Sequence, residues 1–141
     1  MILYSSTNQI KVSMNPLSPT VEEGTFGELL VILRLLQYHV QAFFPLKDSG
    51  NDLIAIKDSR MKAIQVKSSI IEQWAAPEEG KKYDILALVS LKGGDETNLF
   101  LDQSTIYLLS KKEVGDKKSF SSIGWLEQFL LNDNRIKELF S

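Results

Sequence analysis

The stretch GNDLIAIKDSRMKAIQVKSS, residues 50–69, lies near the middle of the 141-residue chain and decides its fold. It contains two runs rich in aliphatic and β-branched residues, 52–56 and 61–69, which are separated by four polar residues. Runs of this length joined by a short polar loop predict a β-hairpin.

The register of the hairpin decides which side chains meet. If Ile56 pairs with Met61, the paired residue numbers sum to 117, and Asp52 lies opposite Gln65. Opposed side chains point to the same side of a sheet with Cβ atoms about 5 Å apart, and alternation adds Lys67 to that side. The polar side chains then converge at the open end of the hairpin, and the other face is apolar: Leu53, Ile64 and Val66.

A helix is predicted over residues 20–39, before the hairpin. This segment is apolar around most of its circumference, so we expect it to be buried on two sides. Glu28 lies on the side with Val31 and Leu35, where a carboxylate is costly unless it is paired, hydrogen-bonded or bound to a metal. We expect Lys67 or a cation shared with Asp52 to satisfy it. Beside it, Gly27 indicates that another element approaches the helix closely.

The rest of the chain alternates further strand and helix patterns. We expect an edge strand within 1–19, strands at 40–45 and 83–90, a hairpin of 99–101 with 106–110, a short helix at 70–76, and helical segments at 125–131 and 136–140. The strand at 83–90 is continuously apolar, which is typical of a strand covered on both faces. Together these elements predict one domain spanning 1–141, an α/β/α sandwich with a central mixed β-sheet.

Composition excludes several chemistries. The chain has no cysteine and one histidine, so disulfides, zinc–thiolate sites and two-histidine zinc sites are excluded. The net charge is −2, although residues 47–67 hold five basic against three acidic residues, which makes this stretch the best candidate to meet a polyanion. We expect no secretory signal, because residues 1–13 carry neither a basic leader nor a small-residue cleavage site. The most apolar window, 29–44, is too short to cross a bilayer. We expect a cytoplasmic protein that does not engage a membrane.

The motifs in this order resemble a known family. Gly27-Glu28, then GNDLIAI from residue 50, then IQVKSS from residue 64, look like the PD-(D/E)XK nuclease superfamily, which has the restriction-endonuclease-like fold. The resemblance covers roughly residues 20–90. It is closest to the branch whose last motif reads Q-V-K, which includes a cyanobacterial intron-encoded homing endonuclease. Archaeal Holliday-junction resolvases share the glutamate on the helix.

The resemblance implies a metal-dependent nuclease that hydrolyses phosphodiester bonds of DNA. Asp52, the side-chain oxygen of Gln65 and the backbone carbonyl of Val66 would bind Mg²⁺, for which Mn²⁺ can substitute. Glu28 would bind a second ion or hold the water network, and Lys67 would orient or deprotonate the attacking water. Such roles are chemically sensible, because a hard divalent ion takes oxygen ligands and a lysine stabilises developing negative charge.

Partner contacts follow from the same interpretation. We expect DNA to be the partner and the protein to be a homodimer or a higher homo-oligomer. The expected nucleic-acid contacts are Lys47, Asn51, Lys57, Arg60, Ser68 and Ser69.

Other interpretations remain open for these residues. Asp52 and Lys67 can form a plain cross-strand ion pair, and serines at a strand end usually cap the chain or face water. Gln65 departs from the commoner acidic residue, and an amide binds a metal more weakly than a carboxylate does. The alternatives are a catalytically silent domain of the same fold that binds nucleic acid or a protein, and an unrelated α/β module with a structural polar cluster.

Overall fold

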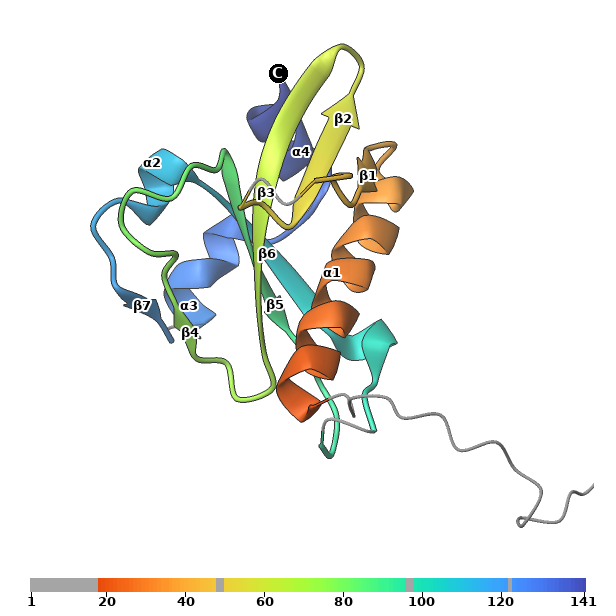
Figure 1. Ribbon diagram of the computed structural model, residues 1–141, viewed down its shortest axis with the longest axis vertical. Helices are drawn as coiled ribbons and strands as arrows, with labels where there is room; N and C mark the ends of the chain where they lie inside the picture. The colour runs from red at the N-terminus through yellow and green to blue at the C-terminus, as the bar shows by residue number, and fades with distance from the viewer. Residues whose placement is uncertain (1–17, 48–49, 96–97, 122) are drawn as a thin grey trace, which may run out of the picture.

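A long helix lies across one face of a central sheet (Figure 1). The computed structural model describes residues 18–47, 50–95, 98–121 and 123–141. The helix, α1 (Pro19–Gln37), begins at Ser18, whose side chain accepts a hydrogen bond from the backbone N–H of Val21 at 3.2 Å. A serine cap followed by proline in the first turn is a favoured start for a helix. The predicted helix is confirmed, with its end two residues earlier than expected.

Five strands form the central sheet in the order β1-β2-β3-β5-β6. Their bounds are β1 (Gln41–Phe43), β2 (Leu53–Lys57), β3 (Arg60–Ser69), β5 (Ile85–Ser90) and β6 (Thr105–Ser110). The pairs β1–β2, β2–β3 and β5–β6 are antiparallel, whereas β3 and β5 are parallel. The sheet is therefore mixed, as the sequence predicts.

Side chains from the two faces of the sheet form two apolar clusters. On one face, Leu53, Val66 and Ala87 pack with Leu30, Val31 and Leu35 of α1. On the other face, Leu86 and Leu88 pack with Trp74, Phe120 and Leu126. All six residues of β5 are buried, which confirms a strand covered on both sides. The sandwich of helices around a mixed sheet is thus confirmed.

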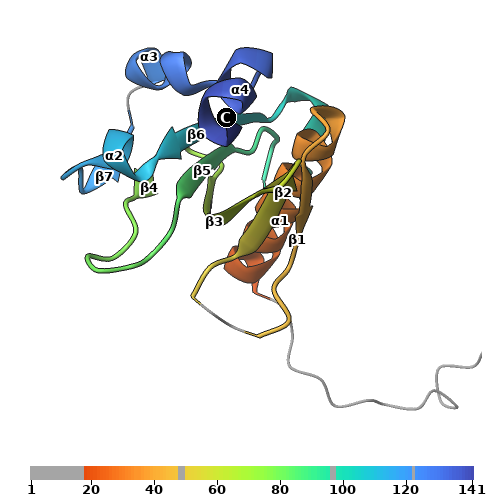
Figure 2. The same ribbon diagram turned by 90° about the horizontal axis from the view of Figure 1, so that it is seen from above.

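The second face is covered by short elements rather than by one long helix (Figure 2). They are β4 (Trp74–Ala75), α2 (Lys111–Val114), β7 (Ser119–Phe120), α3 (Ile123–Leu126) and the 3-10 helix η3 (Glu127–Phe129). A last helix, α4 (Asp133–Phe140), packs with the cluster on the α1 side through Ile136 and Phe140. Of the two expected C-terminal helical segments, 125–131 is replaced by α3 and η3, which end at Phe129. The segment 136–140 is confirmed as α4, which begins three residues earlier than expected.

The short helix expected at 70–76 is wrong. Glu72 has a φ of 58°, which a right-handed helix does not allow. The Ser69 hydroxyl accepts hydrogen bonds from the backbone N–H groups of Ile71 and Gln73, each at 3.1 Å, so the chain turns sharply after β3. Trp74 and Ala75 then pair with β7 as an antiparallel strand. A side chain that satisfies the backbone locally has replaced the helix.

The hairpin of 99–101 with 106–110 is also wrong, because β6 pairs with β5 instead. Leu101–Gln103 forms the 3-10 helix η2, and Leu99 makes a single antiparallel bridge to Gly93. The segment 111–114, which carries no strong pattern, forms α2. An edge strand was expected within 1–19. Residues 1–17 lie outside the described part of the chain, and Ser18 and Pro19 belong to the start of α1.

The outer side of α1 is exposed, so the expectation that the helix is buried on two sides is wrong. Leu29, Leu33 and Leu36 retain 45%, 59% and 59% of their accessible surface. The sheet lies on one side of α1, and within the described residues no second layer covers the other side. No helix in the described parts of the chain is long and apolar enough to cross a membrane.

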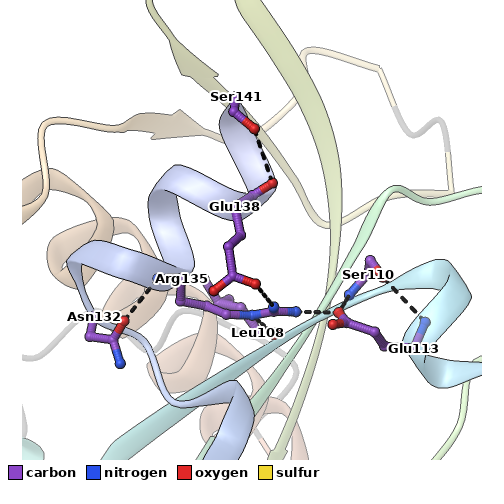
Figure 3. Close-up of polar contacts among 7 residues, drawn as sticks. All are labelled: Leu108, Ser110, Glu113, Asn132, Arg135, Glu138 and Ser141. Atoms are coloured by element: carbon purple, nitrogen blue, oxygen red, sulfur yellow. Dashed lines mark hydrogen bonds and ion pairs between the residues drawn. The ribbon is translucent and has the colours of Figure 1, made fainter.

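Arg135 anchors α4 to the far edge of the sheet (Figure 3). Its side chain is 5% exposed, and its Nε donates to the carbonyl of Leu108 in β6 at 2.9 Å. The guanidinium also forms ion pairs with Glu113 and Glu138. Burial alone would raise the pKa of Glu113, but hydrogen bonds from the Ser110 backbone and from Arg135 outweigh burial and hold that pKa below its usual value. The network therefore ties α4, β6 and α2 together.

Replacing Glu113 by alanine should lower the free energy of unfolding by about 2–3 kcal/mol, because it leaves a buried guanidinium with less compensation. Glu138→Ala is the matched control: its carboxylate is 64% exposed, so we expect a loss of about 1 kcal/mol or less. Chemical denaturation as a function of pH measures both. The pKa of Glu113 is lowered by folding, so the wild-type advantage should be complete above the unfolded pKa and shrink as pH falls through the folded pKa. Equal losses in the two variants would contradict this assignment.

Candidate functional site

The candidate site lies where β3 changes its pairing partner. β3 pairs with β2 as far as Ile64 and with β5 from Ile64 onward. Beyond Ile64, the edge of β3 that faced β2 has no strand beside it within the described residues. The backbone N–H of Val66 faces this edge and donates to Oδ2 of Asp52 at 2.7 Å. The carboxylate takes the place of the missing strand, since a buried N–H needs an acceptor.

The predicted register is confirmed. Ile56 pairs with Met61 and Leu53 with Ile64, so the residue numbers of each pair sum to 117. The side-chain amide of Gln65 donates from Nε2 to Oδ2 of Asp52 at 2.9 Å, which confirms that these two side chains meet. Gln65 is 6% exposed. An aspartate and a glutamine are thus held together at the end of β2.

The four residues predicted to form the site do not share one face of the sheet; they are Glu28, Asp52, Gln65 and Lys67. Gln65 and Lys67 are in register with Leu86 and Leu88, which belong to the cluster on the face away from α1. Glu28 belongs to α1 and therefore approaches from the opposite face. Asp52 lies between the two at the sheet edge, because its carboxylate reaches a backbone N–H in the plane of the sheet. The convergence is therefore around an edge and not on a face.

Glu28 is half-buried and lies close enough to Asp52 to be affected by its charge. Burial raises the pKa of Glu28 above its usual value, and the negative charge of Asp52 raises that pKa further. Lys67 was the expected partner of Glu28, but within the described residues no ion pair joins Lys67 to Glu28 or to Asp52. The two carboxylates are therefore not neutralised by this lysine.

Gly27 lets α1 approach β3 closely beside Glu28. A Cβ atom added to Gly27 would lie 1.7 Å from Oγ and 2.9 Å from Cβ of Ser68, which is too close for any side chain. The close approach predicted from the sequence is confirmed, and the neighbour is β3. This contact fixes the height of α1 above the sheet and with it the position of Glu28.

The donor atoms around Asp52 fit a hard cation. Oε1 of Gln65 and Oδ1 of Asn51 are buried and have no hydrogen-bond partner among the described residues. The Val66 carbonyl faces the same edge as its N–H, because both groups of one residue point to the same neighbouring strand. Such oxygen atoms are the ligands that Mg²⁺ and Mn²⁺ prefer. No cluster of three histidine, cysteine, aspartate or glutamate side chains suits a metal in the described chain, so amide and main-chain oxygens would have to contribute.

The residues expected to contact DNA are not all brought to this site. Lys57 and Arg60 pair with each other at the turn of the hairpin, about 17 Å from Asp52 at 3.4 Å per residue. Lys47 is exposed, and Asn51 directly precedes Asp52.

The two serines are placed differently from the other expected contacts. Ser68 has a buried hydroxyl against Gly27, and Ser69 is buried with its hydroxyl capping the following turn. The expected phosphate contact of these two serines is therefore not supported by their positions.

Asp84 is a residue that the sequence reasoning missed. It immediately precedes β5, as Asp52 precedes β2, and its Oδ2 accepts from the backbone N–H of Ala63 at 2.8 Å. Both aspartates therefore cap a free N–H of β3, one on each edge. The signal in the sequence that could have identified Asp84 is its position directly before the apolar run of β5. Within the described residues, Asp52 alone of the two has a buried amide and a second carboxylate beside it.

Comparison with solved structures finds the bacterial homing endonuclease I-Ssp6803I, with a TM-score of 0.52 and 16% sequence identity. The match covers 71% of this chain and 75% of that chain. No protein-family model matches the chain, and no curated protein matches it. At this identity the likeness concerns the fold, so the chain has a nuclease-like α/β fold.

The titration of Glu28 tests the arrangement of the two carboxylates. Carbon-detected NMR should give a pKa for Glu28 above 4.5 in the wild type, and a smaller rise in Asp52→Asn, because burial remains after the charge is removed. Asp84→Asn removes the other cap on β3 and should leave the pKa of Glu28 unchanged. Since folding raises this pKa, the metal-free protein should lose stability as pH rises through it. An identical pKa in wild type and Asp52→Asn would refute the proximity.

Two glycines of α1 give a matched test of its contact with β3. Gly27→Ala should lower the free energy of unfolding by about 1–3 kcal/mol through overpacking against Ser68. Gly24→Ala, which meets no atom within 4 Å, should raise it by about 0.5–1 kcal/mol, because alanine favours the helix. Adding Ser68→Gly to Gly27→Ala should recover part of the loss in urea denaturation. Equal stabilisation by both alanines would contradict the close approach.

Proposed function

We propose that this protein is a metal-dependent DNA endonuclease of the PD-(D/E)XK type. The observation that carries the proposal is the hydrogen bond from the buried amide of Gln65 to Asp52. Oε1 of Gln65 has no hydrogen-bond partner among the described residues, and Glu28 lies near Asp52. A divalent cation would stabilise two carboxylates and unpartnered oxygen atoms at one sheet edge. The nuclease-like fold agrees with this assignment, and the structural neighbour is a homing endonuclease.

The proposed roles follow the positions of the side chains. Asp52, Gln65 and the Val66 carbonyl would hold Mg²⁺, with Mn²⁺ as a substitute, and Glu28 would hold a second ion or the surrounding water. A bound Mg²⁺ would polarise the phosphodiester and increase the acidity of a water molecule. Lys67 lies two residues after Gln65 in β3, on the same face of the sheet. There its ammonium would stabilise negative charge on the phosphate.

The hairpin offers a second contact with DNA. Lys57 and Arg60 lie at its turn, where the strands run beyond the layer of α1 (Figure 1). Their distance from Asp52, about 17 Å, corresponds to about five base pairs along a duplex. We propose that these two side chains, with Lys47, bind the DNA backbone away from the cleaved bond. The charge distribution supports this proposal, since residues 47–67 carry a net positive charge in an acidic chain.

Cleavage of supercoiled, linear and branched DNA in Mg²⁺ and Mn²⁺ tests the proposal. Asp52→Asn and Lys67→Ala should each reduce the rate by about 100-fold or more. The first removes a carboxylate that would hold the metal ion, and the second removes the ammonium that would stabilise negative charge on the phosphate. Asp84→Asn and Lys112→Ala are the matched controls and should retain near wild-type rates, because Asp84 caps the other edge of β3 and Lys112 is exposed on α2. Cleavage that persists unchanged in Asp52→Asn would overturn the assignment.

A second candidate function is favoured by the same hydrogen bond. The side-chain amide of Gln65 donates a hydrogen bond to Asp52, which partly satisfies that carboxylate without a metal. A catalytically silent domain of the same fold that binds nucleic acid or a protein would keep this bond permanently. Calorimetric titration with Mn²⁺ separates the two functions. Binding that is lost in Asp52→Asn supports the nuclease, and no binding at millimolar Mn²⁺ by the folded protein supports the silent domain.

A further inference from the structure

The solvent side of α1 carries an ordered apolar stripe. Phe26, Leu29, Leu33 and Leu36, which we call the outer stripe, follow one another at intervals of three, four and three residues. Their exposed fractions are 36%, 45%, 59% and 59%. At 3.6 residues per turn this spacing places them along one side of the helix, opposite the side that packs on the sheet. It is the spacing of a helix that packs against another helix.

Two shallow hollows lie along the outer stripe. The first, of about 370 Å³, is lined by Val21, Glu22, Thr25, Phe26 and Leu29. The second, of about 480 Å³, lies between α1 and η2 and is lined by residues that include Leu33, Leu36 and Leu101. Hollows beside protruding leucines are what interdigitating side chains need. The surface therefore has both knobs and holes.

Charge is almost absent from the outer stripe. Arg34 is the charged residue between Leu29 and Leu36, and its guanidinium donates to the carbonyls of Leu101 and Ser104, both at 2.8 Å. It therefore holds η2 against α1 instead of presenting a free charge. A surface without cations does not suit DNA, whose phosphates require them. A second apolar helix is the complementary occupant.

We propose that the outer stripe is the contact between two copies of this chain, with the two α1 helices antiparallel. An antiparallel pair centred between Leu29 and Leu33 brings each of these leucines against the other on the partner subunit. It also places Leu29 of the partner subunit over the hollow beside Leu33, and Leu36 of the partner subunit over the hollow beside Phe26. One surface thus supplies both sides of a two-fold contact, as symmetric dimers require.

The antiparallel arrangement is favoured by charge. A parallel pair would bring Glu22 against the same residue of the partner subunit and align the two helix dipoles. An antiparallel pair separates these glutamates and opposes the dipoles. A contact between single helices belongs to the small class of specific interfaces, below roughly 1,200 Å² in total. We therefore expect dissociation in the micromolar range.

The proposed contact is independent of the cation site. Glu28 faces the sheet and Asp52, while the outer stripe faces away from the sheet, so pairing leaves the site accessible. The dimer would stand even if the nuclease assignment failed. If the protein is a nuclease, the dimer would hold two active sites.

Sedimentation velocity on the full chain between about 1 and 100 µM tests the proposal. Wild-type protein should shift from monomer toward dimer across this range, while Leu33→Glu should remain monomeric. Leu46→Glu is the matched control, because Leu46 is fully exposed outside the outer stripe and should behave as wild type. A wild type that stays monomeric at 100 µM, or a Leu33→Glu protein that still dimerises, would overturn the proposal.

A complementation experiment separates self-association from loss of folding and tests the direction of pairing. Leu29→Lys and Leu33→Glu should each be monomeric alone, because each buries a charge against a leucine of the partner subunit. An equimolar mixture should dimerise, because the lysine of one chain then faces the glutamate of the other. A mixture that remains monomeric, when each variant unfolds cooperatively near the wild-type temperature at 1 µM, would overturn the antiparallel contact.

Discussion

The hydrogen bond from the backbone N–H of Val66 to the carboxylate of Asp52 is the contact on which the candidate site depends. β3 is ten residues long and β2 is five, so β3 must continue without β2 and leave donors and acceptors at its edge. A strand edge inside a protein has to be satisfied by other groups. Here the same aspartate satisfies it and meets Gln65, and in this way the geometry of the sheet creates a polar site.

Asp84 shows that capping alone does not make such a site. It satisfies the N–H of Ala63 on the other edge of β3, as Asp52 satisfies that of Val66. The difference lies in the neighbours: Asp52 has a buried amide and the carboxylate of Glu28, whose pKa is raised by burial and by Asp52. The negative charge of Asp52 opposes the ionisation of Glu28. A cation would relieve this repulsion, whereas Asp84, which only accepts a hydrogen bond from a backbone N–H, needs no cation.

The helix α1 links the site to the rest of the molecule through two different surfaces. Its inner side reaches β3 at Gly27, which sets the position of Glu28. Its outer side exposes leucines at the spacing of a helix-packing surface. At the β6 edge of the sheet, Arg135 binds the carbonyl of Leu108 and holds α4 against β6. The sheet is therefore contacted by a helix backbone on one face, at β3, and by a buried guanidinium at the β6 edge.

Local sequence pattern was enough to predict the β2–β3 hairpin, its register and the contact of Asp52 with Gln65, because alternation along a strand is a local property. It also located α1 and the buried strand β5. It did not determine the turn at Glu72, the pairing of β6 with β5 or the exposed side of α1, since these depend on which distant segments pack together. Only the tertiary structure placed Glu28 and Lys67 on opposite faces, because the side of the sheet that a helix covers is decided by packing and not by spacing along the chain.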